Sequence, residues 1–341
     1  MAERLEFSAL LLGEQVLGRA DSPIILKSRN SFYRRISEKY KNSPPGAALE
    51  VPRERLSAGQ FKNSYFKSGV PVVFNSAAER WPCTRKWDFD FFSRAYGTSD
   101  ILLVASQGLT TLKPAKDFEV TTVHDLVNNI KSGGDKYLRF SPLLQKHPEL
   151  ASDLDLEWLN GMKNRFSFGN TYYLFMGGKG TVTHLHNDQP CNLFVQVHGR
   201  KKWTLFSPTE SHLLYPRMTQ TAYCKSETNL SESDQVKHPL LRNANRWEVI
   251  LNPGDVLYVP PHVWHHVENL TDTIGLGYRF SSIRAAFRSS PLFTILRVLA
   301  QNPPMWKTRK YGKTDTNLIW AHSNGNANEA LKTLAERRAS K

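Results

Sequence analysis

Two histidine clusters in this 341-residue chain carry side chains that could bind a metal ion. In the first, His184, His186 and Asp188 alternate along the stretch TVTHLHND. Alternate residues of an extended strand point to the same side, so these three side chains are predicted to share one face. The second cluster is the pair His265 and His266 in VWHHVENL. Both clusters lie at predicted strand ends, beside turns rich in glycine or proline.

A metal site could combine His186 and Asp188 with one histidine of the second cluster, either His265 or His266. Two imidazoles and one carboxylate leave three coordination positions open, which is typical of non-haem Fe(II) oxygenases. The open positions allow a cosubstrate to chelate the metal at two points while dioxygen takes the third. A closed tetrahedral site would need cysteine ligands, and the chain lacks their spacing.

Other interpretations of the first cluster fit less well. A His-x-Asp pair in a polar strand is, by itself, more often a surface pair than a metal site. The general cupin motif requires a glutamate shortly after its second histidine, where this chain has Pro190 and Cys191. A zinc hydrolase with the same ligands would need a general base or an oxyanion donor, and no pattern for either is evident. The stretch GGKGT lacks the Lys-Ser/Thr ending of a phosphate-binding loop.

From Tyr172 onward the sequence pattern is typical of strands. YYLFMGGKGTVTHLHND predicts two strands joined by a glycine-rich turn. CNLFVQVHGRKKWTLFSP predicts a hairpin that turns at Gly199-Arg200, with Lys201 and Trp203 on one face of its second strand. WEVILNPGDVLYVPPHVWHHVENL predicts two further strands before and within the second histidine cluster, and TIGLGYRFSS predicts a closing strand. The two clusters therefore belong to a β-rich core.

The remaining elements flank that core. Residues 1–45 are predicted to be an N-terminal extension with a helix in SFYRRISEKYK. In the domain predicted over 46–285, helices in LSAGQFKNSYFKSG, KWDFDFFSRAYG and TTVHDLVNNIKSGG alternate with strands in VPVVFNSA and DILLVAS. Residues 209–245 are too long for an ordinary loop and are predicted to form a lid or recognition insert. Residues 286–341 predict a helical region and a basic tail, and an apolar helix face at 285–301 suggests a homodimer.

Composition restricts the environment and the partners. The formal net charge is +14, which favours acidic partners such as RNA or acidic peptides, or a solubilising surface without a partner. Its three cysteines show no paired spacing, which fits a reducing compartment. We find no secretory signal and no apolar run long enough to span a membrane. The sequence therefore predicts a soluble cytoplasmic protein, with the nucleus as the alternative.

Two stretches in this order, HNDQPCNLFVQVHGRKKWTLFSP and PGDVLYVPPHVWHHVENL, resemble the JmjC and cupin-8-like oxygenases. That family includes asparaginyl hydroxylases of proteins and a wybutosine hydroxylase of tRNA. The resemblance extends over roughly residues 50–285 and implies a mainly β protein with a double-stranded β-helix (jelly-roll) core and flanking helices. It also implies Fe(II) and 2-oxoglutarate as cofactors, bound by a metal triad of His186, Asp188 and His265.

The resemblance further implies four contacts with 2-oxoglutarate. Lys201 corresponds to the lysine that pairs with the far carboxylate of the cosubstrate, and Thr183 and Tyr137 correspond to hydroxyl groups near the same carboxylate. Asn192 is the next match. These roles are physically reasonable, because a dianion in a partly buried site needs a cation and hydroxyl donors to replace its water.

The implied function is Fe(II)- and 2-oxoglutarate-dependent hydroxylation of a protein or peptide side chain. The alternatives are an RNA nucleoside hydroxylase, which the basic charge favours, then a lysine demethylase, or a non-catalytic cupin scaffold. The closing strand GLGYRF departs from the family pattern. Tyr278 and Phe280 are expected to stand in the part of the pocket where the asparaginyl hydroxylase of hypoxia-inducible factor has other side chains.

Overall fold

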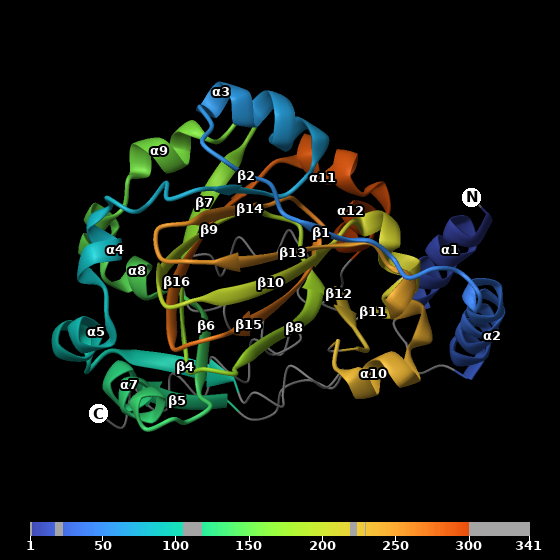
Figure 1. Cartoon of the computed structure of the whole chain (residues 1–341), viewed down its shortest axis with the longest axis horizontal. Helices are drawn as coiled ribbons and strands as arrows, with labels where there is room; N and C mark the ends of the chain where they lie inside the picture. Colours follow the sequence, from blue (N-terminus) through green and yellow to red (C-terminus); the bar gives the residue numbers. More distant parts are fainter. Residues whose placement is uncertain (1, 18–22, 105–117, 219–223, 229, 300–341) are drawn as a thin grey trace.

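Two β-sheets form the centre of the protein (Figure 1). The computed structural model describes residues 2–17, 23–104, 118–218, 224–228 and 230–299. The first sheet has the order β1-β13-β10-β15-β8-β12-β11 and the second has the order β2-β3-β14-β9-β16-β7-β6. The strands of the first sheet are β1 (Ala48–Glu50), β8 (Val182–Asn187), β10 (Lys201–Phe206), β11 (Pro216–Met218), β12 (Cys224–Ser226), β13 (Arg246–Leu251) and β15 (Trp264–Asn269). Those of the second sheet are β2 (Arg53–Glu54), β3 (Val72–Phe74), β6 (Tyr137–Ser141), β7 (Phe168–Gly177), β9 (Cys191–His198), β14 (Val256–Val259) and β16 (Thr273–Ser281).

Consecutive core strands lie in opposite sheets, which is the arrangement of a jelly roll. The chain passes from β7 to β8, from β9 to β10, from β13 to β14 and from β15 to β16 by crossing between the sheets. The hairpin predicted at Gly199 is therefore wrong, because β9 pairs with β14 and β16 while β10 pairs with β13 and β15. The turn itself is present, and Gly199 has a φ of +68° there. A short turn ordinarily joins two strands that pair with each other. The turn at Gly199 instead joins β9 of the second sheet to β10 of the first sheet.

Alternation along each strand divides the core into an inner and an outer part. Trp203 and Leu205 of β10 meet Phe194 of β9 and Phe175 of β7 between the sheets. The opposite face of the second sheet packs against helices through residues such as Leu193 of β9. The barrel interior is thus lined largely by aromatic and aliphatic side chains.

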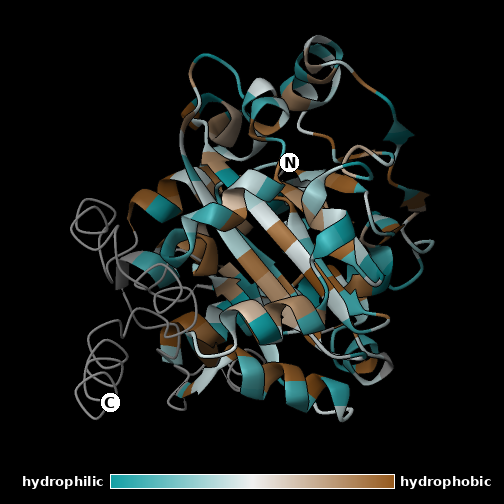
Figure 2. Ribbon diagram, turned by 90° about the vertical axis from the view of Figure 1, so that its left-hand side faces the viewer, coloured by the Kyte–Doolittle hydropathy of each residue, from teal (hydrophilic) through white to brown (hydrophobic). Residues whose placement is uncertain are grey.

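Most helices cover the outer face of the second sheet. They are α3 (Ala58–Phe61), η1 (Lys62–Phe66), α4 (Pro82–Lys86), α5 (Phe89–Tyr96), α7 (Val123–Lys131), α8 (Leu143–Lys146), η2 (Pro148–Asp153), α9 (Leu156–Gly161) and α11 (Ile283–Ser289), with a small sheet of β4 (Asp100–Val104) and β5 (Phe118–Thr122) beside them. In Figure 2 the helices alternate between hydrophilic and hydrophobic colours while the central strands are mostly white or brown. Ser57 and Thr122 begin α3 and α7 with capping boxes, as their sequences suggest.

The N-terminal region is more ordered than the prediction of an extension with one short helix. It forms two helices, α1 (Ala2–Leu17) and α2 (Pro23–Tyr40), of which the first was not predicted. Phe7 and Phe32 are buried against the segment after β10 and against α12 (Pro291–Val298). That segment, predicted as an insert, contains η3 (Pro208–Leu213), β11, β12, α10 (Glu232–Lys237) and η4 (Pro239–Asn243), and its strand β12 extends the first sheet beside β8.

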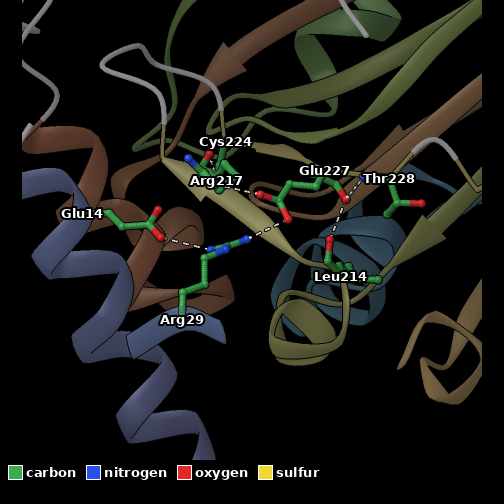
Figure 3. Close-up of polar contacts among 8 residues, drawn as sticks. Glu14, Arg29, Leu214, Arg217, Cys224, Glu227 and Thr228 are labelled. Carbon is green, nitrogen blue, oxygen red and sulfur yellow. Dashed lines mark hydrogen bonds and ion pairs between the residues drawn. The ribbon is translucent and has the colours of Figure 1, made fainter. Parts of the chain in front are cut away.

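Linked ion pairs connect the N-terminal helices to the antiparallel strands β11 and β12 (Figure 3). Arg29 of α2 contacts Glu14 of α1 at 3.0 Å and Glu227 at 3.4 Å. Glu227 follows β12 and also contacts Arg217 of β11 at 3.0 Å. Because Arg29 lies between two carboxylates, its charge is matched although it is buried.

The C-terminal helix uses part of its apolar face within the chain. In α12, Phe293 and Leu296 are buried beside Trp264 of β15, while Ile295 and Val298 are exposed. The homodimer predicted through this region stays a prediction, and the basic tail lies outside the described residues. Across the part of the chain described here, no helix combines the length and the apolar character needed to cross a membrane.

We expect Arg29→Met to lower the free energy of unfolding by about 3–5 kcal/mol, because Glu14 would lose its buried cation. Urea unfolding followed by tryptophan fluorescence measures this change. Arg35→Met is the matched control, since Arg35 pairs with Glu6 across the same two helices but with side chains 56% and 44% exposed. Equal effects of the two substitutions would contradict the structural role given to Arg29.

Candidate active site

The three predicted metal ligands meet inside the barrel. His186 is near the end of β8, Asp188 directly follows that strand, and His265 is on the adjacent strand β15 in register with His186. One ligand atom from each lies within 4.8 Å of the others, and all three residues are buried. The backbone N–H of His262 donates to the carbonyl of Asp188 at 2.7 Å, which ties the turn before β15 to the end of β8.

Backbone carbonyls fix which nitrogen of each imidazole faces the centre. The Nδ1 of His186 lies 2.7 Å from the carbonyl oxygen of His184, and the Nδ1 of His265 lies 3.0 Å from that of Val263. A carbonyl only accepts hydrogen bonds, so each Nδ1 carries the proton and each Nε2 carries the lone pair. Burial lowers the pKa of His265 to about 4 and holds the pKa of His186 well below its usual value. Both rings are therefore neutral at physiological pH, as metal coordination requires.

This donor set fits a divalent transition metal. Two neutral imidazoles and one carboxylate on one side of a site form the facial triad of non-haem iron oxygenases. The hydrogen bonds from each Nδ1 to backbone oxygens are the outer contacts that orient such ligands. Within the described residues, His186, Asp188 and His265 make the one cluster of this kind.

The remaining two histidines of the sequence clusters face the other way. The pairing of β8 with β15 is irregular between His265 and Val267, so Thr183 and His186 both face the interior. His184 and His266 line a cavity of about 650 Å³ on the outer side of the first sheet, together with Lys202 and other residues. The expectation that His184 shares a face with His186 was wrong, because this irregularity interrupts the alternation of side chains.

Lys201, Tyr137 and Thr183 form one hydrogen-bonded group in the interior. Lys201 is fully buried and its Nζ donates to the Tyr137 hydroxyl at 2.9 Å. Burial acts to raise the pKa of Tyr137, but the Lys201 ammonium and hydrogen bonds from Lys201 and Thr183 outweigh it and lower the pKa. The ammonium also lies 5.9 Å from the Phe175 ring centre and 5.5 Å from that of Phe194. A buried cation beside two hydroxyl groups has the chemistry needed to bind a carboxylate.

Asn192 also lies in the interior, on β9 of the second sheet. It is 7% exposed on β9, in register with Arg279 of β16. An added Cβ at Gly277 would approach the Asn192 side-chain oxygen at 3.2 Å, so the glycine leaves room beside it. That Asn192, Lys201, Thr183 and Tyr137 bind the cosubstrate stays a prediction.

The closing strand places a different residue in the pocket from the one expected. Tyr278 and Phe280 point outward into the helix-covered core, where the Phe280 ring stacks on Phe66 at 6.3 Å. Arg279, between them, points inward, and its guanidinium forms an ion pair with the Asp188 carboxylate. The expectation that Tyr278 and Phe280 line the pocket was therefore wrong, because the inward-facing residue is the one between them. The inward-facing glycines of GLGYRF were the available signal, since Arg279 shares their side of the strand.

Two more buried cations stand near the triad, and the sequence patterns did not indicate either. Lys225 of β12 is 6% exposed and is in register with His186. Burial and the nearby Arg139 guanidinium lower the pKa of Lys225 to about 8. Arg139 of β6 is 2% exposed and donates to the carbonyl of Val182 at 3.2 Å. The interior around the triad is therefore strongly positive.

Known proteins share this region of the chain. The family described as Cupin-like domain matches residues 58–285. The chain is 27% identical over 228 residues to Lysine-specific demethylase 8 of Xenopus tropicalis. That match covers 66% of this chain and 51% of the relative. It is 29% identical over 241 residues to JmjC domain-containing protein D of Dictyostelium discoideum, with 64% and 53% coverage. It is 37% identical over 140 residues to human HSPB1-associated protein 1, with 39% and 28% coverage.

The chain spans about half the length of the first two of these relatives. The family match, by contrast, includes both histidine clusters, the interior lysine and most core strands. It confirms the fold class predicted from the sequence, a mainly β protein with a jelly-roll core, and it confirms the family resemblance. The chain belongs to the cupin-like JmjC domains, the family of Fe(II)- and 2-oxoglutarate-dependent oxygenases.

Proposed function

We propose that this protein is an Fe(II)- and 2-oxoglutarate-dependent hydroxylase of a protein or peptide side chain. The observation that carries the proposal is the presence of an open triad of metal ligands together with a buried lysine that donates to a tyrosine hydroxyl. His186, Asp188 and His265 offer three ligands on one side, and the Lys201–Tyr137 pair lies in the same barrel interior. A binding scaffold would have no need for this combination.

Two groups of residues would bind the two ends of 2-oxoglutarate. Lys201 and the hydroxyls of Tyr137 and Thr183 would receive the far carboxylate, and the triad would hold the metal that the keto acid chelates. Desolvating a dianion is costly unless its water is replaced by charged and hydroxyl partners, and Lys201 supplies the charge. The aromatic rings around Lys201 keep water away from this end.

Iron and 2-oxoglutarate together would supply the oxidising chemistry. When bound, they would allow one oxygen atom of O₂ to be inserted into a carbon–hydrogen bond of the substrate as a hydroxyl group, while the other would enter succinate as 2-oxoglutarate loses CO₂. The protein contributes ligand geometry, neutral imidazoles and an interior from which bulk water is excluded. Hydrogen bonds to backbone carbonyls hold the rings of the two ligands His186 and His265 in place.

A protein substrate has the support of the relatives' names. Lysine-specific demethylase 8 of Xenopus tropicalis and the Arabidopsis thaliana protein JMJ30 are both named for action on lysine. RNA hydroxylation rests on the basic composition of the sequence alone, with its net charge of +14. A soluble, cytoplasmic or nuclear location is part of the proposal, as is the dimer through the C-terminal helices.

The first experiment measures succinate formation from 2-oxoglutarate with peptide and RNA libraries, followed by mass spectrometry for a gain of one oxygen atom. We expect turnover with peptides. Succinate formation with RNA alone would show that the substrate is a nucleic acid. The absence of any Fe(II)-dependent turnover would refute the proposed enzymatic activity.

We expect His186→Ala and Asp188→Ala to abolish stoichiometric Fe(II) binding in protein purified without oxygen, because each removes one of three ligands. Metal analysis measures this directly, without reference to activity. His184→Ala is the matched control, since His184 lies on the outer side of the same strand. Retention of iron by Asp188→Ala would place the metal elsewhere.

We expect Lys201→Met to raise the KM for 2-oxoglutarate by about tenfold or more, because a charged hydrogen bond to the cosubstrate is lost. Iron content should stay unchanged. The neighbouring Lys202→Met is the control, since Lys202 faces the outer side and pairs with Glu248 at 3.4 Å. An unchanged KM in Lys201→Met would remove Lys201 from the cosubstrate site.

A further inference from the structure

The described residues place more positive than negative charge inside the barrel. Lys201, Lys225 and Arg279 are buried there, and Asp188 is the buried carboxylate beside them. The other buried acids of the described chain are paired elsewhere: Glu14 with Arg29, Asp153 with Lys86 and Asp255 with Arg53. The barrel interior is therefore complementary to an anion.

Iron and cosubstrate do not remove this imbalance. Fe(II) brings two positive charges and 2-oxoglutarate brings two negative charges, so their joint binding leaves the sum in the interior unchanged. Lys201 is already matched to the cosubstrate in the proposed function, and Arg279 contacts Asp188. Lys225 is left without an acidic partner among the described residues.

Lys225 is positioned as a binding group. Its Nζ is buried and has no hydrogen-bond partner in the described part of the chain. It stands in register with the ligand His186 on the neighbouring strand, so it lies at the edge of the triad. A buried ammonium without a partner is costly, and such a group in a native structure calls for a ligand that satisfies it.

Arg279 is a second buried cation, close enough to His186 to add, with Lys225, to the effect of burial in lowering the pKa of that imidazole. It comes from the second sheet, whereas Lys225 comes from the first. Its guanidinium lies 5.2 Å from the Phe140 ring centre and 6.0 Å from that of Tyr173, and its Nε has no partner among the described residues. An anionic group that enters beside the metal would therefore come close to both cations.

We propose that the Lys225 ammonium, together with the Nε–H of Arg279 that the contact with Asp188 does not use, recognises an acidic side chain, aspartate or glutamate, at or next to the residue that is hydroxylated. This inference rests on the proposed function and specifies its substrate. Lys225 and Arg279 are only 6% and 8% exposed, so the anion must reach deep into the barrel, as a single side chain does. The phosphates of RNA are held between sugars along a chain and do not extend in this way. A lysine substrate would be repelled by the same charges.

The test measures peptide binding without turnover. The full-length protein is loaded with Mn(II) in place of iron and with 2-oxoglutarate. Fluorescent peptides share degenerate flanks and differ only at the central residue, which is Asp, Glu, Asn or Lys. We expect the wild-type protein to bind Asp and Glu peptides more tightly than Lys peptides by fluorescence anisotropy.

We expect Lys225→Met to weaken binding of the acidic peptides by about tenfold and to leave the Lys peptides unaffected or improved. Lys225→Arg, which keeps the charge, should restore binding. Lys202→Met on the outer side is the matched control. Lys225→Gln serves as a second neutral variant, and Mn(II) binding with thermal unfolding shows that each variant is folded.

The inference is overturned if the wild-type protein prefers Lys peptides, or if both neutral variants bind acidic peptides as the wild type does. Binding of an RNA oligonucleotide that depends on Lys225 would assign the cation to phosphate and overturn it too. A rise in the KM for 2-oxoglutarate with unchanged peptide binding would assign Lys225 to the cosubstrate, against the inference but not against the proposed function. Conversely, Lys225-dependent binding of acidic peptides without any succinate formation would support the recognition while refuting the hydroxylase.

Discussion

Charged groups inside an apolar barrel must be held by partners or ligands, and this constraint governs much of the molecule. Trp203, Phe194 and Phe175 make the interior suitable for excluding water, which raises the energetic cost of every unpaired ion there. Tyr137 meets Lys201, and Arg279 meets Asp188. The imidazoles avoid the cost by staying neutral. The buried charge that still lacks a partner among the described residues, the Lys225 ammonium, indicates the charge of the ligand that the site binds.

The same constraint explains why the N-terminal helices and the segment after β10 matter to the site. Lys225 is carried by β12, which pairs with β8 only at its end. Arg29 of α2 contacts Glu227, which follows β12, so the N-terminal helices help to position the strand that carries Lys225.

Individual site residues show what the sequence patterns could predict and what they could not. Residue types and order predicted a site of His186, Asp188 and one histidine of the second cluster. The family resemblance selected His265 and gave Lys201 its role. Arg279 was missed because the strand was aligned one residue out of phase. His184 was placed on the wrong face because an irregular pairing cannot be seen in one strand alone. Lys225 had no local signal, since its position depends on pairing between distant segments.

The edges of the two sheets bear on what constitutes the folding unit. Residues matched by the family begin at 58, whereas β1 and β2 precede them and stand at one end of each sheet's strand order. Without these strands, the backbone groups of β13 and β3 would be left unpaired at open edges, and such edges promote association between chains. Loss of α1 and α2 would also uncover the apolar surface that Phe7 and Phe32 fill. The unit recognised by sequence similarity is therefore smaller than the unit that pairs β13 and β3 at these edges and covers this apolar surface.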